Sequence, residues 1–98
     1  MEFTWLPERE RSNIRAHGLD FSLARQVLAN PLSDTLLDGV LYGEERWRIT
    51  GTVRGDDWLK TLVIILTYPN PDDDTRVHVL SLREATAHER RRYAVPRL

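Results

Sequence analysis

The order of apolar and polar residues divides the chain into a helical beginning and a longer β-rich remainder. Residues 2–5 alternate in polarity, which favours a short edge strand. Pro7 suits the first turn of a helix, and Glu8 and Glu10 follow where the helix dipole favours acidic side chains. Gly18 is a natural helix terminator. We therefore predict a helix that starts at Pro7 and ends before Gly18.

A second helix is predicted to begin after Asp20, because aspartate commonly caps helix N-termini. Asn30-Pro31 ends it, since the residue before a proline avoids the helical conformation. The apolar stripe of this helix has the spacing of one helical face and consists of Leu23, Ala24, Val27 and Leu28.

From Asp34 onward the apolar residues recur with a period of two, which is typical of strands. Residues 34–41 are either a strand or an extended loop. Residues 45–54 are predicted to form a strand, and residues 55–57 a turn. One face of the strand carries Trp47, Ile49, Gly51 and Val53, and the other carries Arg46, Arg48, Thr50, Thr52 and Arg54.

The next segment, residues 59–68, contains five consecutive apolar residues at 62–66 and is predicted to be a central strand covered on both faces. Residues 69–74 form a loop by composition. Residues 75–82 are predicted to return as an antiparallel strand.

A final helix is predicted from Thr86 to about Tyr93, because Thr86 and Glu89 have the spacing of a capping box. Pro96 marks the tail. The pattern as a whole predicts an α+β domain with two N-terminal helices, an antiparallel three- to four-stranded meander sheet and a C-terminal helix.

Composition supports a single soluble domain, residues 1–98. Apolar residues make up 41% of the chain and charged residues 30%, which is ordinary for a globular protein. The longest apolar run is far shorter than the roughly 18 residues of a membrane span. Residues 1–5 lack the features of a signal peptide, so we expect a cytoplasmic protein. Without cysteine the chain has no disulfide and no thiolate zinc site.

The charge distribution is more informative than the net charge of −1. Residues 83–97 carry five arginines against two glutamates, whereas the rest of the chain is mildly acidic. Such a basic end is compatible with local binding of phosphate. The chain has thirteen arginines and one lysine, and arginine suits bidentate phosphate contacts, although GC-rich coding DNA produces the same bias.

His17 is a candidate for proton transfer near neutral pH. The other interpretation is a histidine half-buried at a helix end and bonded to a last-turn carbonyl. Arg46 and Arg48 point the same way from one strand, where fixed guanidinium groups can stabilise a phosphoryl transition state. Alternatively, they form a solvated face paired with Glu44, Glu45 or a neighbouring strand.

Arg83 follows a strand and shares parity with Val77 and Val79, so it is predicted to lean toward their face. Such an arginine is either paired inside the fold or directed into a concave site. The basic C-terminal residues combine positive charge with a ring that can stack on a base, and they are candidates for RNA binding, for a solvated end or for docking a partner: Arg90, Arg91, Arg92 and Tyr93.

The sequence contains few other candidates for chemistry. The three histidines have no metal-ligand spacing, and residues 72–74 lack the EF-hand pattern. No glycine-rich phosphate loop or nucleophile elbow is present. We expect no metal and no cofactor.

Together these segments resemble the BrnT family of bacterial type II toxins, ribonucleases with a RelE-like fold. The resemblance covers nearly the whole chain. It is carried by Phe3-x-Trp5, Asn13-x-x-x-His17-Gly18 with Phe21, Asn30-Pro31, Gly43-Glu44-x-Arg46 with Gly51, Ser81-x-Arg83-x-Ala85-Thr86, and Glu89-Arg90-x-x-Tyr93.

The resemblance implies a toxin that cleaves RNA and is neutralised by a BrnA-like antitoxin, whose DNA-binding part represses the operon. It implies functional roles for His17, Glu44, Arg46 and Arg83, and for Tyr93. Two positions depart from the family. Ala16 stands where lysine is usual, and His78 stands where arginine is frequent.

The favoured hypothesis is a metal-independent endoribonuclease in which the RNA 2′-hydroxyl attacks the adjacent phosphate. His17 would move protons, Arg46 and Arg83 would hold the phosphate, and Glu44 would orient an arginine or act as base. Arg48, Arg90, Arg91 and Tyr93 would bind RNA. The alternative is a non-catalytic module that grips a partner protein or nucleic acid through its arginine-rich C-terminal helix.

Overall fold

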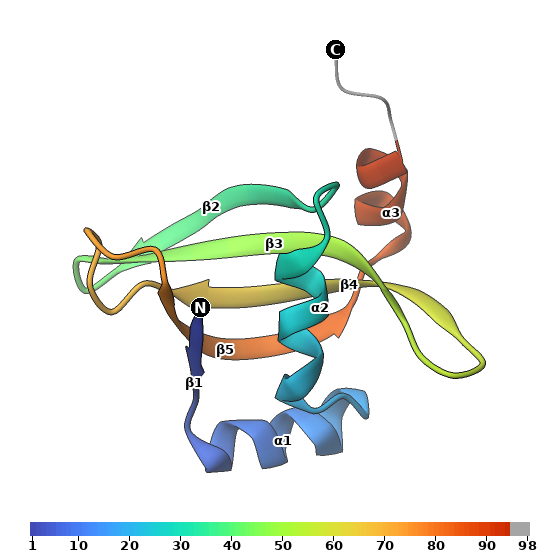
Figure 1. Ribbon diagram of the computed structural model, residues 1–98, viewed down its shortest axis with the longest axis horizontal. Coiled ribbons are helices and arrows are strands. Elements are labelled where there is room, and N and C mark those ends of the chain that lie inside the picture. The colour runs from blue at the N-terminus through green and yellow to red at the C-terminus, as the bar shows by residue number, and fades with distance from the viewer. Residues whose placement is uncertain (95–98) are drawn as a thin grey trace.

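Five strands and three α-helices are present in the computed structural model, which describes residues 1–94 (Figure 1). The predicted segments are found close to their expected positions, and residues 34–41 are a strand. Pro96 lies outside the described residues. In chain order the elements are β1 (Glu2–Thr4), α1 (Pro7–His17), a 3-10 turn (Phe21–Leu23), α2 (Ala24–Ala29), β2 (Asp34–Leu41), β3 (Glu44–Arg54), β4 (Leu59–Thr67), β5 (Arg76–Glu84) and α3 (Ala87–Ala94).

The sheet is mixed, with the strand order β1-β5-β4-β3-β2. β2 to β5 form the expected antiparallel meander, whereas β1 lies parallel to β5, with Phe3 beside Val77. The predicted antiparallel meander is therefore confirmed with four strands, and the sheet has a fifth strand, β1, whose parallel pairing was not predicted. Alternation of polarity identifies a strand but contains no information about its partner, and of the two edges of the meander β1 joins the one formed by β5.

The first helix has the predicted ends. Pro7 occupies its first turn, and Gly18 adopts the left-handed conformation, with a φ angle of 71°. The Gly18 N–H donates to the Ile14 carbonyl over 2.8 Å, which closes the helix. The second helix is shorter than predicted because Asp20 caps a 3-10 turn instead, accepting from the Ser22 N–H over 3.0 Å. This tighter turn places Phe21 in the core, and regular α-helix begins only at Ala24.

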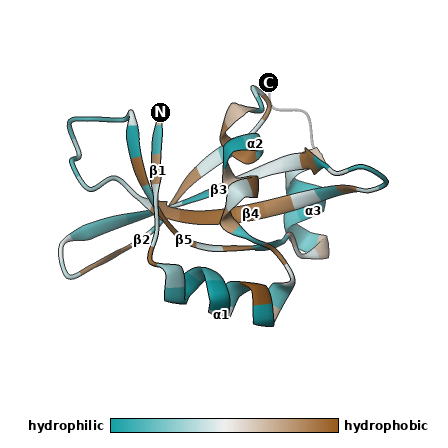
Figure 2. Cartoon of the chain, turned by 60° about the horizontal axis from the view of Figure 1, so that its bottom comes forward, coloured by the Kyte–Doolittle hydropathy of each residue, from teal (hydrophilic) through white to brown (hydrophobic). Residues whose placement is uncertain are grey.

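The hydrophobic core lies between the helices and one face of the sheet. Figure 2 shows the apolar colour concentrated along β4, the central strand. Trp5 packs edge-on against Phe21, with ring centroids 5.9 Å apart. The fully buried core side chains include Phe21, Val27, Ile49, Val53, Leu62, Ile64, Leu66, Val77, Val79 and Leu82.

The opposite face of the sheet, here called the open face, faces away from α1 and α2. The prediction that residues 62–66 are covered on both faces is confirmed at Val63, which is fully buried on the face opposite Leu62, Ile64 and Leu66, whereas Ile65 is half-buried. From the strand registers, the open face carries Arg46, Arg48 and Thr50 of β3, Val63 and Ile65 of β4, and His78, Ser81 and Arg83 of β5.

A β-bulge in β5 determines which residues reach the open face. Ser81 pairs with Ile65, but Val79 pairs with Leu66, so Leu80 is an extra residue. The bulge reverses the alternation of side chains along the strand. Arg83 therefore lies on the face opposite Val77 and Val79, and the parity prediction for Arg83 was wrong.

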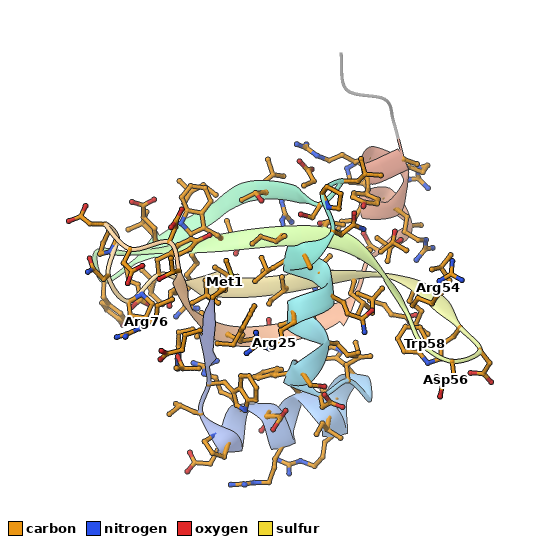
Figure 3. All side chains as sticks on the ribbon, in the orientation of Figure 1. Met1, Arg25, Arg54, Asp56, Trp58 and Arg76 are labelled. Atoms are coloured by element: carbon orange, nitrogen blue, oxygen red, sulfur yellow. The ribbon has the colours of Figure 1, made fainter. Side chains whose placement is uncertain are left out.

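The turn between β3 and β4 is held by the ring of Trp58, which folds back over Gly55 (Figure 3). A Cβ added at Gly55 would lie 2.2 Å from the Trp58 ring, so this position requires glycine. Lys60 lies over the same ring, with its Nζ 5.3 Å from the centroid. None of the helices within residues 1–94 is long and apolar enough to cross a membrane.

Asn13 attaches α1 to the sheet. β1 covers only the first part of the β5 edge, and beyond it the Asn13 side chain takes the place of a neighbouring strand. Its amide nitrogen donates to the carbonyls of Leu82 and Leu19 over 2.8 and 2.9 Å, and its oxygen accepts from the Leu82 N–H over 3.0 Å. Because Asn13 is 6% exposed, all three bonds are shielded from water.

We predict that Asn13→Asp destabilises the protein by about 2–4 kcal/mol, because a carboxylate oxygen would face two carbonyl oxygens in a buried site. Urea unfolding followed by circular dichroism measures the change. Ser12→Ala is the control, since Ser12 is exposed and bonds only to Arg15. Equal stability of Asn13→Asp and the wild-type chain would show that α1 is held to β5 by apolar packing alone.

Candidate functional site

Three of the predicted arginines share the open face of the sheet. Arg48 and Arg46 are two residues apart on β3, and Arg83 lies at the end of β5. Across the sheet Ser81 pairs with Ile65, which in turn pairs with Arg48. Strands lie about 4.8 Å apart, so Arg48 is roughly 10 Å from Ser81 at the backbone. Arg48 and Arg83, which are 35 residues apart in sequence, thus contribute cations to one surface.

Arg83 is held by a bidentate ion pair with Glu89 of α3. Its two terminal nitrogens donate to the two carboxylate oxygens over 2.7 and 3.0 Å, and Nη1 also donates to the Glu84 carbonyl over 3.2 Å. The structure therefore contains the paired arrangement that the sequence left open as an alternative. These three bonds use three of the five N–H groups of the guanidinium.

Glu89 has a second function as the cap of α3. Its Oε1 accepts from the Thr86 N–H over 2.9 Å, while the Glu89 N–H donates to the Thr86 hydroxyl over 3.1 Å. The predicted capping box is thus confirmed. The hydrogen bonds from Arg83 lower the pKa of Glu89 to about 2, although burial acts in the opposite direction, and the Thr86 N–H adds to the lowering. The same pair raises the pKa of Arg83.

Arg48 extends this ion pair into a small network. Its Nη1 lies 3.4 Å from Glu89 and its Nε lies 3.8 Å from Asp38 of β2. The two guanidiniums of Arg48 and Arg83 therefore face two carboxylates, and little net positive charge remains at this corner of the open face.

Arg46 differs from both, because its Nε is buried and meets no hydrogen-bond acceptor among the described residues. Leaving a buried donor unsatisfied costs about 1–3 kcal/mol, and a ligand cannot reach this nitrogen unless the side chain moves. Among residues 1–94 Arg46 forms no ion pair, so no carboxylate neutralises its charge.

His17 lies at the margin of the open face. It is exposed at the end of α1, unlike the half-buried histidine of the alternative interpretation. A shallow hollow of about 390 Å³ separates α1 from β5 at this point. The hollow is lined by Glu8, Arg9, Ser12, Asn13, Ala16, His17, Leu80 and Ser81.

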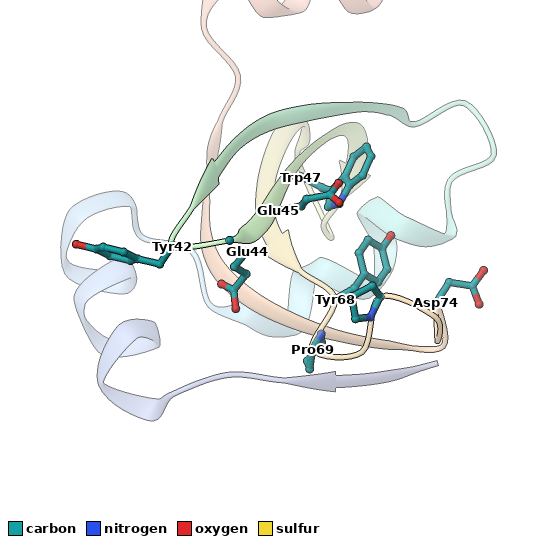
Figure 4. A pocket seen from close by; sticks show the side chains of 9 residues that line it. Tyr42, Glu44, Glu45, Trp47, Tyr68, Pro69 and Asp74 are labelled. Atoms are coloured by element: carbon teal, nitrogen blue, oxygen red, sulfur yellow. The ribbon is translucent and has the colours of Figure 1, made fainter.

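Glu44 lies elsewhere, in a pocket at the tip of the β2–β3 hairpin (Figure 4). Glu44 begins β3, so along the strand it is roughly 7 Å from Arg46 and about twice that from Arg48. The pocket, here called the hairpin pocket, has a volume of about 420 Å³. It is lined by Tyr42, Gly43, Glu44, Glu45, Trp47, Tyr68, Pro69, Pro71 and Asp74.

The predicted RNA-binding residues of α3 project from one corner of the molecule. Arg91 is exposed, whereas Arg90 donates to the Ala85 carbonyl over 2.8 Å. Tyr93 is half-buried. Arg92 lies 3.8 Å from Asp34 of β2. Figure 1 shows α3 at one end of the sheet, to which Glu89 links it through Arg48 and Arg83.

His78 also lies on the open face. In the sequence it stood out only as a departure from the pattern of the family that the chain resembles. Its neighbours Val77 and Val79 are core residues, so its side chain points to the other side. Thr4 of β1 pairs with His78, and its hydroxyl lies 2.8 Å from the imidazole Nδ1. That contact orients the ring. Sequence reasoning missed it because only the parallel pairing of β1 brings the two residues together.

Comparison with known proteins identifies the family. The model of the ribonuclease toxin BrnT of type II toxin–antitoxin systems matches residues 5–89. The chain belongs to the BrnT family. The resemblance noted in the sequence is therefore confirmed. No curated protein matches the chain.

Membership of the BrnT family has two consequences. The family consists of ribonuclease toxins, so RNA cleavage is the activity associated with this fold and sequence. A type II toxin also has a protein antitoxin as its partner. Residues 5–89 include His17, Glu44, Arg46 and Arg83, whereas the basic end of α3 follows the matched segment.

The structure brings only some of the predicted residues together. Arg46, Arg48 and Arg83 share the open face, and His17 lies at its edge. Glu44 lines the hairpin pocket instead, and α3 lies beside Arg48 and Arg83, with which its Glu89 forms ion pairs. Among residues 1–94, no three histidine, cysteine, aspartate or glutamate side chains are grouped so that they could hold a metal ion.

The lowered pKa of Glu89 predicts a stability that depends on pH. A carboxylate whose pKa falls from 4.5 to about 2 on folding stabilises the protein fully above pH 4.5, by about 3 kcal/mol, and this contribution disappears as the pH falls toward 2. The free-energy gap between the wild-type BrnT chain and Glu89→Gln should therefore be large at pH 7 and shrink steadily below pH 4.5.

Urea unfolding of both proteins at pH 7, 5, 4 and 3 measures this gap. Glu84→Gln is the control, because Glu84 is exposed and lies 3.6 Å from Lys60 in a surface pair. Its gap should stay below about 1 kcal/mol throughout. If the difference in unfolding free energy between the wild-type chain and Glu89→Gln is the same at pH 7 and pH 3, the ion pair does not lower the pKa of Glu89.

Proposed function

We propose that this BrnT-family chain is a toxin that cleaves RNA on the open face of its sheet, without a metal, by attack of the RNA 2′-hydroxyl. The proposal is supported by the family match together with three arginines on one face and a histidine at its margin. A BrnA-like antitoxin would be its neutralising partner in the cytoplasm.

The chemistry needs proton transfer and charge stabilisation but no protein nucleophile. The 2′-oxygen forms a bond to phosphorus, the bond from phosphorus to the 5′-oxygen breaks, and a cyclic phosphate and a free 5′-hydroxyl result. His17 would exchange the protons that leave the 2′-hydroxyl and arrive at the 5′-oxygen. Arg46 and Arg83 would stabilise the pentavalent phosphate, and Glu44 would orient Arg46 or act as base. Arg48, Arg90, Arg91 and Tyr93 would contact the RNA strand.

The observation that carries the proposal is that Arg46, unlike Arg48 and Arg83, takes part in no ion pair within residues 1–94. A phosphate oxygen would supply the partner that the protein lacks, at the terminal nitrogens of the guanidinium, because the Nε itself is buried. The ion pairs of Arg48 and Arg83 hold their guanidiniums in place and keep part of each available, since 34% and 31% of the two side chains are exposed.

Replacing Arg46 should abolish most of the activity. We predict that Arg46→Ala lowers kcat/KM for a fluorogenic RNA by about a hundredfold or more, because one electrostatic contact to a phosphoryl transition state is removed. Arg54→Ala is the matched control: Arg54 shares the β3 face but lies at the far turn (Figure 3), and its loss should change the rate less than threefold. Equal kcat/KM values for the two variants would show that Arg46 is not part of the catalytic site.

Variants of Arg83 and Glu89 distinguish a direct role of Arg83 in catalysis from a role in positioning α3. Losing either residue breaks the ion pair that positions α3, but only Arg83→Ala also removes a cation from the open face. We predict that Arg83→Ala lowers kcat/KM by about a hundredfold, while Glu89→Ala lowers it less than tenfold. If both variants lose activity equally, Arg83 acts only by positioning α3.

The pairing of Arg83 favours one alternative, a non-catalytic module that grips a partner through α3. A growth assay distinguishes the two functions. Expression of a nuclease should arrest cells and degrade their RNA, and His17→Ala should relieve both effects. If expression leaves RNA intact in the wild-type and the variant alike, the binding module is the correct function.

A further inference from the structure

The hairpin pocket combines aromatic walls with carboxylates and lies apart from the cationic open face. Trp47 and Tyr68 form its aromatic part, with ring centroids 6.5 Å apart and ring planes inclined at 74°. Figure 4 shows Glu45 next to Trp47 and Glu44 on the Pro69 side of the hollow, whereas Tyr42 points away. Every charged side chain in its lining is acidic: Glu44, Glu45 and Asp74.

These carboxylates are not neutralised within the protein. Across residues 1–94 none of the three takes part in an ion pair or a side-chain hydrogen bond. The negative charge of Asp74 also reaches the ring: burial raises the pKa of Tyr68, and the Asp74 charge raises it further. Unpaired carboxylates beside aromatic faces attract a cation both by charge and by the ring quadrupole.

The pocket continues into an exposed apolar strip on β2. Leu37 pairs with Trp47 and Val40 pairs with Glu45, so both side chains stand on the same face as the pocket. They are 51% and 61% exposed, because α2 contacts β3 and β4 and leaves this end of the sheet bare (Figure 1). Within residues 1–94 β2 is also an edge strand, so an added strand could pair with the outer backbone groups of residues 35–41.

Charge and shape together identify the kind of occupant. RNA is disfavoured here, since three unpaired carboxylates repel phosphate. A guanidinium or ammonium group matches the acidic, aromatic pocket, and apolar side chains next to it match the apolar strip on β2. The partner must therefore be a protein segment with a basic residue among apolar ones.

We propose that the hairpin pocket receives an arginine or lysine side chain from an apolar-flanked segment of the antitoxin, which lies along β2. The proposal rests on the type II partnership of the family, and its tests use Glu45 and Asp74, which have no role in the proposed cleavage mechanism. Antitoxin and RNA would then occupy surfaces of opposite charge that meet at Glu44.

The minimal test uses N-acetyl-arginine methylamide as the probe, with its neutral isostere N-acetyl-citrulline methylamide as control. Titration followed by ¹H–¹⁵N NMR should shift resonances of residues 37–47 and 68–74 with the arginine compound only. The double variant Glu45→Gln/Asp74→Asn should weaken this binding at least fivefold. Equal responses to both compounds, no response at 50 mM, or shifts centred on the open face would each overturn the proposal.

The second test measures antitoxin affinity by calorimetry. Glu45→Lys should weaken the complex at least tenfold, whereas Asp56→Lys, the same charge change at the β3–β4 turn, should stay within twofold of wild type. Glu45 is exposed, so the substitution leaves the fold intact, as circular dichroism will verify. Unchanged antitoxin binding by Glu45→Lys, with or without a gain in RNA affinity, would overturn the assignment of the occupant. Loss of RNA cleavage would bear only on the proposed nuclease function.

Discussion

Leu80, the extra residue in the β5 bulge, determines where the charges of this protein lie. Without the bulge, continuous alternation would direct Arg83 into the core beside Val77 and Val79, where an unpaired guanidinium is strongly unfavourable. With it, Arg83 joins Arg46 and Arg48 on the open face. One irregularity in one strand thus creates a cationic surface from two separate parts of the sequence.

Glu89 then limits how much of that positive charge is available. Its carboxylate caps α3, accepts two hydrogen bonds from Arg83 and lies beside Arg48, so a single side chain links helix, sheet edge and candidate site. The linkage holds a helix that has no buried side chain of its own. It also leaves Arg46 as the cation of the open face whose Nε still needs an acceptor.

Opposite charges occupy different parts of the molecule. The open face presents arginines, and the hairpin pocket presents unpaired carboxylates beside Trp47 and Tyr68. A BrnT-family toxin has two kinds of ligand, a polyanionic RNA and a protein antitoxin. Surfaces of opposite sign allow each ligand to be recognised by electrostatic complementarity, and of the residues proposed for cleavage Glu44 alone also lines the hairpin pocket.

Local rules were sufficient for most elements. The helix from Pro7 to His17, the capping box at Thr86 and Glu89, and the alternating strands were all evident in the sequence, because caps, turns and side-chain periodicity depend on neighbouring residues. The two faces of β3 were also predicted correctly, with arginines opposite Trp47 and Ile49. The ordered set of short motifs was enough to indicate the family.

Long-range contacts decided the rest. The parallel pairing of β1, the bulge that redirects Arg83, the Thr4–His78 contact and the separation of Glu44 from the arginine network all depend on residues distant in sequence. Strand alternation has a period of two, so one inserted residue reverses every later side chain without any local signal. Which arginine finds a carboxylate and which is left for a ligand is therefore a property of the folded sheet.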